Sequence, residues 1–216
     1  MRAAFLGAVL IAVSIVAGAE PAADPLARLQ DWLDGARTLS GRFVQELESG
    51  ALGGQVVERG RLWVERPGKL RWEYSAPEIK TAIVVGEHTQ LYLASERQLF
   101  EGRLDPEAGL LTALLGGTQR LSTLFSASPD GDTPVPRDRP ASERIRLRPL
   151  AGAPAEFEEA VVTVRRSDGA LLTADVLDAA GNRMTYRFEG LERNRKIPPG
   201  TFTLDPPAGT EIVRQP

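Results

Sequence analysis

Apolar and charged residues alternate with a period of two along much of this chain. The pattern is clearest from Leu70 to Tyr74, where Leu70, Trp72 and Tyr74 are separated by Arg71 and Glu73. Such alternation predicts a strand with one apolar face and one charged face. The preceding Pro-Gly pair predicts a turn, because proline fixes φ and glycine tolerates positive φ. Two aromatic rings on one face indicate a sheet that covers something large and apolar.

Short runs of the same kind recur at close spacing and predict about eleven strands. These lie at residues 43–48, 56–65, 69–74, 81–85, 90–94, 98–104, 143–147, 159–165, 170–177, 183–188 and 202–204. The pairs Asp168-Gly169 and Gly181-Asn182 fit hairpin turns, and the spacing is typical of an antiparallel meander. Residues 126–141 are rich in Pro, Asp, Ser and Gly, so a loop is predicted there.

Two segments have helical periodicity instead. Residues 24–39 carry apolar side chains at helical spacing, with Asp24 as a cap and Pro25 in the first turn. Residues 106–125 contain a stripe of four leucines that ends at Gly116-Gly117: Leu110, Leu111, Leu114 and Leu115. A second short piece continues the apolar pattern with Leu121, Leu124 and Phe125. This second segment is equally compatible with a core helix and with a lid over the sheet.

The first residues have the composition of a secretory signal peptide. Arg2 is a short positive region, residues 5–16 are apolar, and Ala17-Gly18-Ala19 is a small-x-small cleavage pattern. The apolar run is too short to span a membrane stably. We therefore expect residues 1–19 to be removed near Ala19, leaving 20–216 as a single exported domain.

Charge and cysteine content narrow the possible partners. The chain carries 26 Lys and Arg against 29 Asp and Glu, and no basic stripe stands out, so no nucleic acid partner is expected. It has no cysteine, which excludes a disulfide framework and a lipid-modified cysteine at the cleavage site. We expect a soluble monomer in the compartment to which it is exported.

Enzyme chemistry is hard to find in this sequence. The single histidine, His88, lies in a predicted turn and has no cysteine or second histidine to assist it. No nucleophile elbow, phosphate-binding loop or dinucleotide fingerprint occurs. We therefore expect no catalytic residue, no metal and no cofactor.

The apolar faces of the predicted strands carry the functional argument instead. In a nearly closed sheet of many strands one face points inward, where side chains either fill a core or line a ligand cavity. The candidates for this inner face are Phe43, Leu70, Trp72, Tyr74, Met184, Tyr186 and Phe188. Periodicity alone leaves core and cavity open as alternatives.

Three segments resemble the LolA family of periplasmic lipoprotein carriers. Gly41-Arg42-Phe43-Val44-Gln45, after the first helical segment, is similar to the family's opening strand. Residues 60–74, GRLWVERPGKLRWEY, followed by Pro77, resemble its most recognisable segment. Residues 202–210, FTLDPPAGT, resemble its ending. The order and spacing of these landmarks span most of the chain.

The resemblance implies a mainly β fold with a helical lid (α+β), an incomplete and strongly curved antiparallel β-barrel covered by helices. Its cavity would bind the acyl chains of a lipoprotein released by an inner-membrane ABC transporter, for delivery to an outer-membrane receptor. Arg66 matches the residue that latches the family's lid. Leu70 matches a hydrophobic position implicated in cargo transfer, although aromatic residues are familiar there.

Competing interpretations remain open at this stage. A periplasmic module for another lipid or glycolipid would use the same half-barrel. The membrane-bound receptor of the same pathway shares the fold but needs a lipidated cysteine, which this chain lacks. A secreted hydrolase is disfavoured because a nucleophile and its base are missing.

Overall fold

The computed structural model describes residues 24–49, 54–104, 109–117, 119–131, 141–153 and 157–215. The predicted signal peptide, residues 1–19, and its cleavage near Ala19 lie outside these ranges. Across the described ranges, no helix has both the length and the apolar character needed to cross a membrane.

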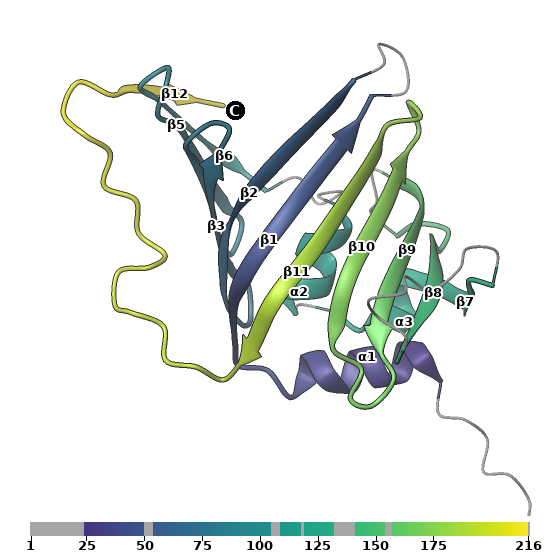
Figure 1. The fold of residues 1–216 in the computed structure, drawn as a ribbon. Helices are drawn as coiled ribbons and strands as arrows, with labels where there is room; N and C mark the ends of the chain where they lie inside the picture. The colour runs from purple at the N-terminus through teal and green to yellow at the C-terminus, as the bar shows by residue number, and fades with distance from the viewer. Residues whose placement is uncertain are drawn as a thin grey trace, which may run out of the picture.

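A single sheet accounts for all twelve strands in the described ranges (Figure 1). The strands are β1 Thr38–Glu48, β2 Gln55–Glu65, β3 Lys69–Ala76, β4 Lys80–Val85, β5 His88–Leu93, β6 Gln98–Arg103, β7 Phe125–Pro129, β8 Ser142–Pro149, β9 Phe157–Arg165, β10 Leu171–Asp178, β11 Arg183–Arg193 and β12 Glu211–Arg214. Their order is β12-β6-β5-β4-β3-β2-β1-β11-β10-β9-β8-β7. Neighbours pair antiparallel except β12, which is parallel to β6. The predicted fold class, a mainly β fold forming an incomplete, curved antiparallel barrel covered by helices, is confirmed as an open curved sheet, with twelve strands in the described ranges where about eleven were predicted.

The sheet bends sharply where β2 crosses between β1 and β3. Gly60 pairs with Phe43 on one side and Tyr74 on the other, beside a register irregularity at Arg59. A Cβ on Gly60 would overlap the carbonyl oxygen of Glu73 and lie 2.8 Å from Cε1 of Phe43. Only glycine permits this close approach, which brings the aromatic side chains of β1 and β3 together on the concave face.

Three short helices accompany the sheet in the described ranges: α1 Pro25–Asp34, α2 Leu110–Gly116 and α3 Leu121–Leu124. In Figure 1, α1 lies across one end of the sheet and α2 lies against its concave face. Buried leucines of α1 and α2 join apolar strand residues in one core cluster, so the helices close part of the half-barrel. The helical cover is modest, and much of the concave face of β4–β6 extends beyond it.

The first helix is shorter than predicted. Asp24 caps it by accepting a hydrogen bond from the Leu26 amide at 3.0 Å, as expected. The helix ends at Asp34, however, and the prediction that it reaches Leu39 is wrong. Thr38 and Leu39 pair with Glu65 and Val64 of β2, so strand pairing determines the conformation of these residues.

The predicted helical segment 106–125 contains two separate helices in its described part. Phe125 begins β7 and does not end a helix. The loop predicted for 126–141 is also partly wrong, because Ser126–Pro129 completes β7, which pairs with β8. Residues 106–108, 118 and 132–140 lie outside the described ranges.

The strand predicted at residues 202–204 is not present. Prolines interrupt this region, and the amides of Thr201 and Thr203 form local turns with Pro198 and Gly200. The segment instead runs outside β3 and reaches the sheet edge, where Glu211–Arg214 forms β12 (Figure 1). Arg71 of β3 holds it by donating hydrogen bonds to the carbonyls of Thr201 at 2.8 Å and Thr203 at 3.3 Å.

We predict that Gly60→Ala destabilises the fold. The added methyl forces β2 away from Glu73 and Phe43, and overpacking of this kind costs about 1–3 kcal/mol. Urea denaturation followed by circular dichroism gives the free energy of unfolding. Gly131→Ala is the matched control, because its Cβ meets nothing within 4 Å. Equal stability of the two variants would show that close approach at Gly60 does not shape the sheet.

Candidate functional site

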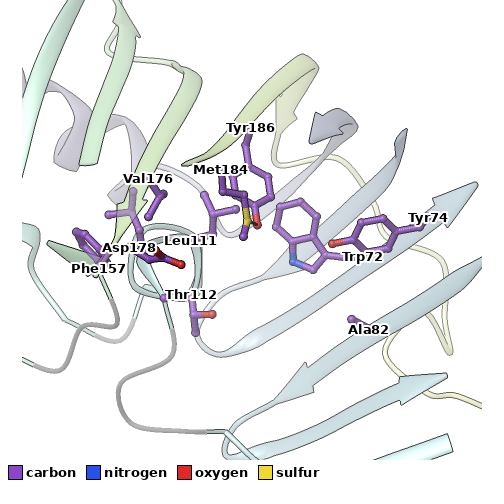
Figure 2. Close-up of a pocket in the computed structure, with 12 residues that line it drawn as sticks. Trp72, Tyr74, Ala82, Leu111, Thr112, Phe157, Val176, Asp178, Met184 and Tyr186 are labelled. Atoms are coloured by element: carbon purple, nitrogen blue, oxygen red, sulfur yellow. Dashed lines mark hydrogen bonds between the residues drawn. The ribbon is translucent and has the colours of Figure 1, made fainter. Parts of the chain in front are cut away.

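A pocket of about 320 Å³ lies on the concave face, between the sheet and α2 (Figure 2). One wall consists of aromatic and sulfur-containing side chains from β3 and β11: Trp72, Tyr74, Met184 and Tyr186. Leu110, Leu111 and Thr112 of α2 cover it, and Phe157 and Val176 of β9 and β10 form the far side. The lining is mainly apolar, as expected for a lipid or another hydrophobic ligand.

Phe43 supports the aromatic wall from beneath. Its ring meets Trp72 edge-on with centroids 4.8 Å apart and Tyr74 edge-on at 5.0 Å. Tyr186 lies 5.9 Å from Trp72, so the four rings form one cluster. Because Phe43 is only 1% exposed, it fixes the orientation of the rings above it.

An apolar row continues from the pocket toward the edge of the sheet. Trp72 stands opposite Ala82, Ala82 opposite Leu91, and Leu91 opposite Phe100 on adjacent antiparallel strands. Residues directly opposite each other share a face of the sheet. Leu91 is 36% exposed, so the apolar surface reaches beyond the region that α2 covers.

Burial sets the electrostatics of the two pocket tyrosines. Loss of solvent raises the pKa of Tyr74 and of Tyr186 well above the usual range, and the nearby Glu58 carboxylate raises both further. The Tyr74 hydroxyl donates to Oε1 of Gln45 at 3.0 Å, and the Tyr186 hydroxyl donates to Sδ of Met184. Both phenols therefore remain neutral at ordinary pH.

Arg66, directly after β2, joins α1 and α2 to the sheet. Its guanidinium donates to the Leu33 carbonyl near the end of α1 and lies 3.9 Å from the Asp34 carboxylate. It packs directly on Gly117 at the end of α2, where a Cβ would overlap the guanidinium. In the following turn, the Gly68 amide donates to the Gly116 carbonyl at 2.9 Å.

The Arg66 side chain is only 9% exposed. Burial lowers the pKa of its guanidinium, and Asp34 partly offsets this effect. Its Nε is buried without a hydrogen-bond partner among the described residues. A buried cation that is incompletely paired costs free energy, so the net stabilisation from this contact is smaller than its hydrogen bond alone would give.

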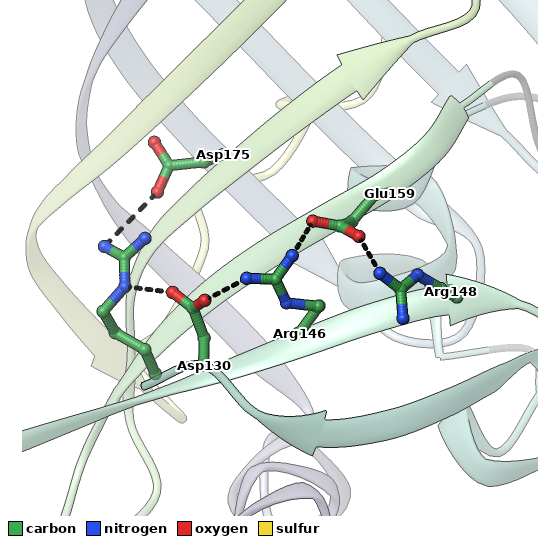
Figure 3. Close-up of polar contacts among 6 residues, drawn as sticks. Asp130, Arg146, Arg148, Glu159 and Asp175 are labelled. Atoms are coloured by element: carbon green, nitrogen blue, oxygen red, sulfur yellow. Dashed lines mark hydrogen bonds and ion pairs between the residues drawn. The ribbon is translucent and has the colours of Figure 1, made fainter. Parts of the chain in front are cut away.

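The outer face of β7–β10 carries a chain of ion pairs behind the far wall of the pocket (Figure 3). Asp130, whose side chain is 1% exposed, accepts from Arg144 at 2.7 Å and from Arg146 at 2.5 Å. Arg146 also binds Glu159 of β9 at 2.5 Å, and Glu159 binds Arg148 at 2.6 Å. Burial raises the pKa of Asp130, but the hydrogen bonds from the two arginines outweigh it and leave the pKa below its usual range.

The structure separates the sequence-predicted residues into two layers. Trp72, Tyr74, Met184 and Tyr186 line the pocket, together with Leu110 and Leu111 of the second helical segment. The remaining candidates are fully or almost fully buried in the core beneath it: Phe43, Leu70, Leu114, Leu115 and Phe188. The structure therefore places part of the set at the pocket and the rest in the core.

Sequence reasoning missed the far side of the pocket. Its residues Phe157, Val176 and Asp178 are not among the predicted site residues, although Val176 lies in a predicted strand and shares its inner face with Ala174. Ala82 also lines the pocket, but its small side chain contributes little to the hydrophobic pattern of the strand. The period-two pattern could have identified Val176 and Ala82, but only the fold shows that β10 faces β3 across the pocket.

An open curved sheet with a helix-covered apolar pocket defines a binding protein of the half-barrel type. The profile of the family described as "Outer membrane lipoprotein carrier protein LolA" matches residues 34–205. The chain therefore belongs to the LolA family. This confirms the sequence-based recognition and the expectation of a transport protein that is not an enzyme.

Individual relatives agree with this assignment. Outer-membrane lipoprotein carrier proteins of Alkalilimnicola ehrlichii and Chromobacterium violaceum are each 29% identical to the chain. The alignments cover 97% and 94% of this chain and 93% and 95% of the relatives. An uncharacterised conserved protein from Thermus thermophilus, of known crystal structure, shares the fold with a TM-score of 0.56 at 14% identity, covering 88% of this chain and 97% of that one.

We predict that Asp130→Asn lowers the free energy of unfolding at pH 7 by about 1.5–3 kcal/mol, the range for hydrogen bonds to charged groups. The folded-state pKa of Asp130 lies below its unfolded value. Its contribution is therefore present above roughly pH 4 and is lost as pH falls through the folded pKa. Urea denaturation between pH 3 and pH 7 should show the two proteins converging in acid.

Glu192→Gln is the control for this prediction, since Glu192 pairs with Arg195 at 3.1 Å in an exposed setting. Exposed pairs contribute little, so this variant should match the wild type throughout. A constant stability difference across the pH range for Asp130→Asn would contradict an ionised Asp130 as the source of the effect.

Proposed function

We propose that the protein is a periplasmic carrier that binds the acyl chains of lipoproteins in the concave pocket. It would receive them from an inner-membrane ABC transporter and deliver them to an outer-membrane receptor. The observation that carries the proposal is the apolar pocket under α2. Arg66, which donates to Leu33 of α1 and packs on Gly117 at the end of α2, would hold the pocket closed. Membership in the LolA family supports the carrier role.

The pocket requires a conformational change to hold its cargo. A volume of about 320 Å³ is at the low end for ligand sites. A lipoprotein with several acyl chains therefore needs α2 to move away from the sheet. Leu110 and Leu111 line the pocket from α2, so their displacement would expose the apolar wall of β3 and β11.

The contact at Arg66 would keep the affinity within a useful range. Acyl burial contributes about 0.8 kcal/mol per CH₂, so several chains in an ideal pocket would hardly dissociate. If opening breaks the hydrogen bond to Leu33 and the packing on Gly117, part of the binding free energy is lost. The cargo would then be held firmly and could still be handed on.

We predict that Trp72 reports acyl binding by a change in fluorescence. Of the three tryptophans, Trp72 lines the pocket, whereas Trp32 is buried in α1 and Trp63 lies on the outer face beside Arg71. Addition of a fatty acid should change the emission of the wild type and of Trp63→Phe. The change should be nearly absent in Trp72→Phe. An equal response in Trp72→Phe would place the ligand elsewhere.

We predict that Arg66→Leu accepts cargo readily but releases it poorly. The variant removes a charge-assisted hydrogen bond worth about 1.5–3 kcal/mol in the closed state, which corresponds to roughly tenfold or more in the transfer equilibrium. Wild type and variant are loaded with the same lipoprotein, and transfer to receptor-bearing membranes is measured.

Arg193→Leu is a matched control for this experiment. Arg193 also donates to a carbonyl of α1, that of Trp32 at 3.1 Å, but it has no described contact with α2. If opening moves α1 and α2 together through Arg66, loss of the Arg193 bond alone, which leaves Arg66 in place on Leu33 and Gly117, should keep transfer close to that of the wild type. Normal transfer by a folded Arg66→Leu protein would show that Arg66 is no latch, and retention by both variants would assign the effect to α1 docking.

A further inference from the structure

An ion pair stands beside the aromatic wall of the pocket. Nζ of Lys80 lies 2.6 Å from Oε1 of Glu58, and the two side chains are 24% and 13% exposed. The same ammonium lies 4.2 Å from the centre of the Tyr74 ring, which lines the pocket. The pair therefore borders the wall of the pocket at Tyr74 and is still accessible to solvent.

The strand register places both charges on the concave face. Lys80 stands opposite Tyr74 on β3 and β4. Glu58 stands opposite Gln45, and Gln45 stands opposite Tyr186. Directly opposed residues share a face, so the pair belongs to the same surface as the two pocket tyrosines. Glu58 is near enough to both phenols to raise their pKa values, which agrees with this placement.

The charge around the pocket is unfavourable for anions. None of the described residues that line it is Lys or Arg, whereas Asp178 is among them. Hydrogen bonds from Asn182 lower the pKa of Asp178, so this carboxyl is ionised at neutral pH. A phosphate group would find Lys80 as a nearby cation, but Lys80 already pairs with Glu58. Binding there would set two like charges close together.

A neutral polar group fits the same surroundings well. Lys80 offers N–H donors, Glu58 offers acceptor oxygens, and Gln45 has a carboxamide beside them. Ester carbonyls and an amide N–H can share these groups without separating the ion pair. An N-acylated, diacylglyceryl-modified cysteine carries such groups and no phosphate.

We propose that the Glu58–Lys80 pair is a selectivity element that admits the neutral ester and amide region of an acylated peptide and rejects anionic phospholipids. The inference rests on the proposed function, because it assumes that acyl chains occupy the pocket. It adds the discrimination that a lipoprotein carrier needs beside phospholipid membranes, where acyl chains alone do not distinguish cargo from bulk lipid.

Two ligands with identical chains test the proposal. Dioctanoylglycerol is neutral, and dioctanoyl-phosphatidylglycerol adds a phosphate anion. Binding is measured by fluorescence titration. The wild type should prefer the neutral lipid. In Glu58→Gln, which frees Lys80, affinity for the phosphatidylglycerol should rise at least about tenfold while affinity for the diacylglycerol changes little.

Two further variants test whether the gain in affinity comes from the charge of Lys80 or from a loosened structure. Glu58→Gln combined with Lys80→Gln leaves no cation, so its phosphatidylglycerol affinity should return to the wild-type level. Lys80→Met leaves Glu58 unpaired and should bind the anionic lipid more weakly than the wild type. A gain that persists in the double variant, or an unchanged preference in Glu58→Gln, would overturn the proposal.

A neutral triacylated cysteinyl peptide distinguishes this failure from failure of the proposed function. If the wild-type protein binds the peptide and shows no preference between the two dioctanoyl lipids, the selectivity element is refuted. The proposed carrier function is then unaffected. Wild-type protein that binds neither the peptide nor dioctanoylglycerol refutes the carrier function and the inference with it.

Discussion

One side chain, Arg66, joins α1 and α2 to the sheet at a single point. Directly after β2 it donates to the last turn of α1 and packs on the end of α2, so one guanidinium joins three elements that are distant in the sequence. Glycine at position 117 is required for the contact, because any larger residue would displace the guanidinium. Burial of an incompletely paired cation makes the junction specific in geometry but modest in net free energy.

The concave face carries an apolar wall that the helices cover only in part. The bend at Gly60 gathers Phe43, Trp72 and Tyr74 into an aromatic wall that α2 covers only in part. A fully packed core would leave no room for a ligand, and an uncovered wall of this kind would favour aggregation. The small pocket under α2 lies between a fully packed core and a fully exposed apolar wall. The Glu58–Lys80 pair gives the rim a polar character that the apolar wall lacks.

Sequence patterns predicted the sheet well because period-two alternation reflects a face that is buried locally. They failed where pairing between distant segments determines the structure. Thr38 and Leu39 continue a helical pattern but begin β1, because they pair with β2. Strand β12 forms through parallel pairing with β6, which lies far earlier in the chain. The pocket's near wall was recognisable from Trp72 and Tyr74. The ion pair of Glu58 and Lys80 was not, since two charges apart in the chain carry no sign that they meet.

The central claim is that α2 leaves the sheet when acyl chains enter. The chain has no cysteine, so spin labels can be placed uniquely at Ala113 on α2 and at the exposed Glu96 between β5 and β6. Double electron–electron resonance then compares the empty protein with the protein loaded with a triacylated peptide. The account predicts a longer and broader distance distribution on loading. An unchanged distribution with the peptide bound would contradict it.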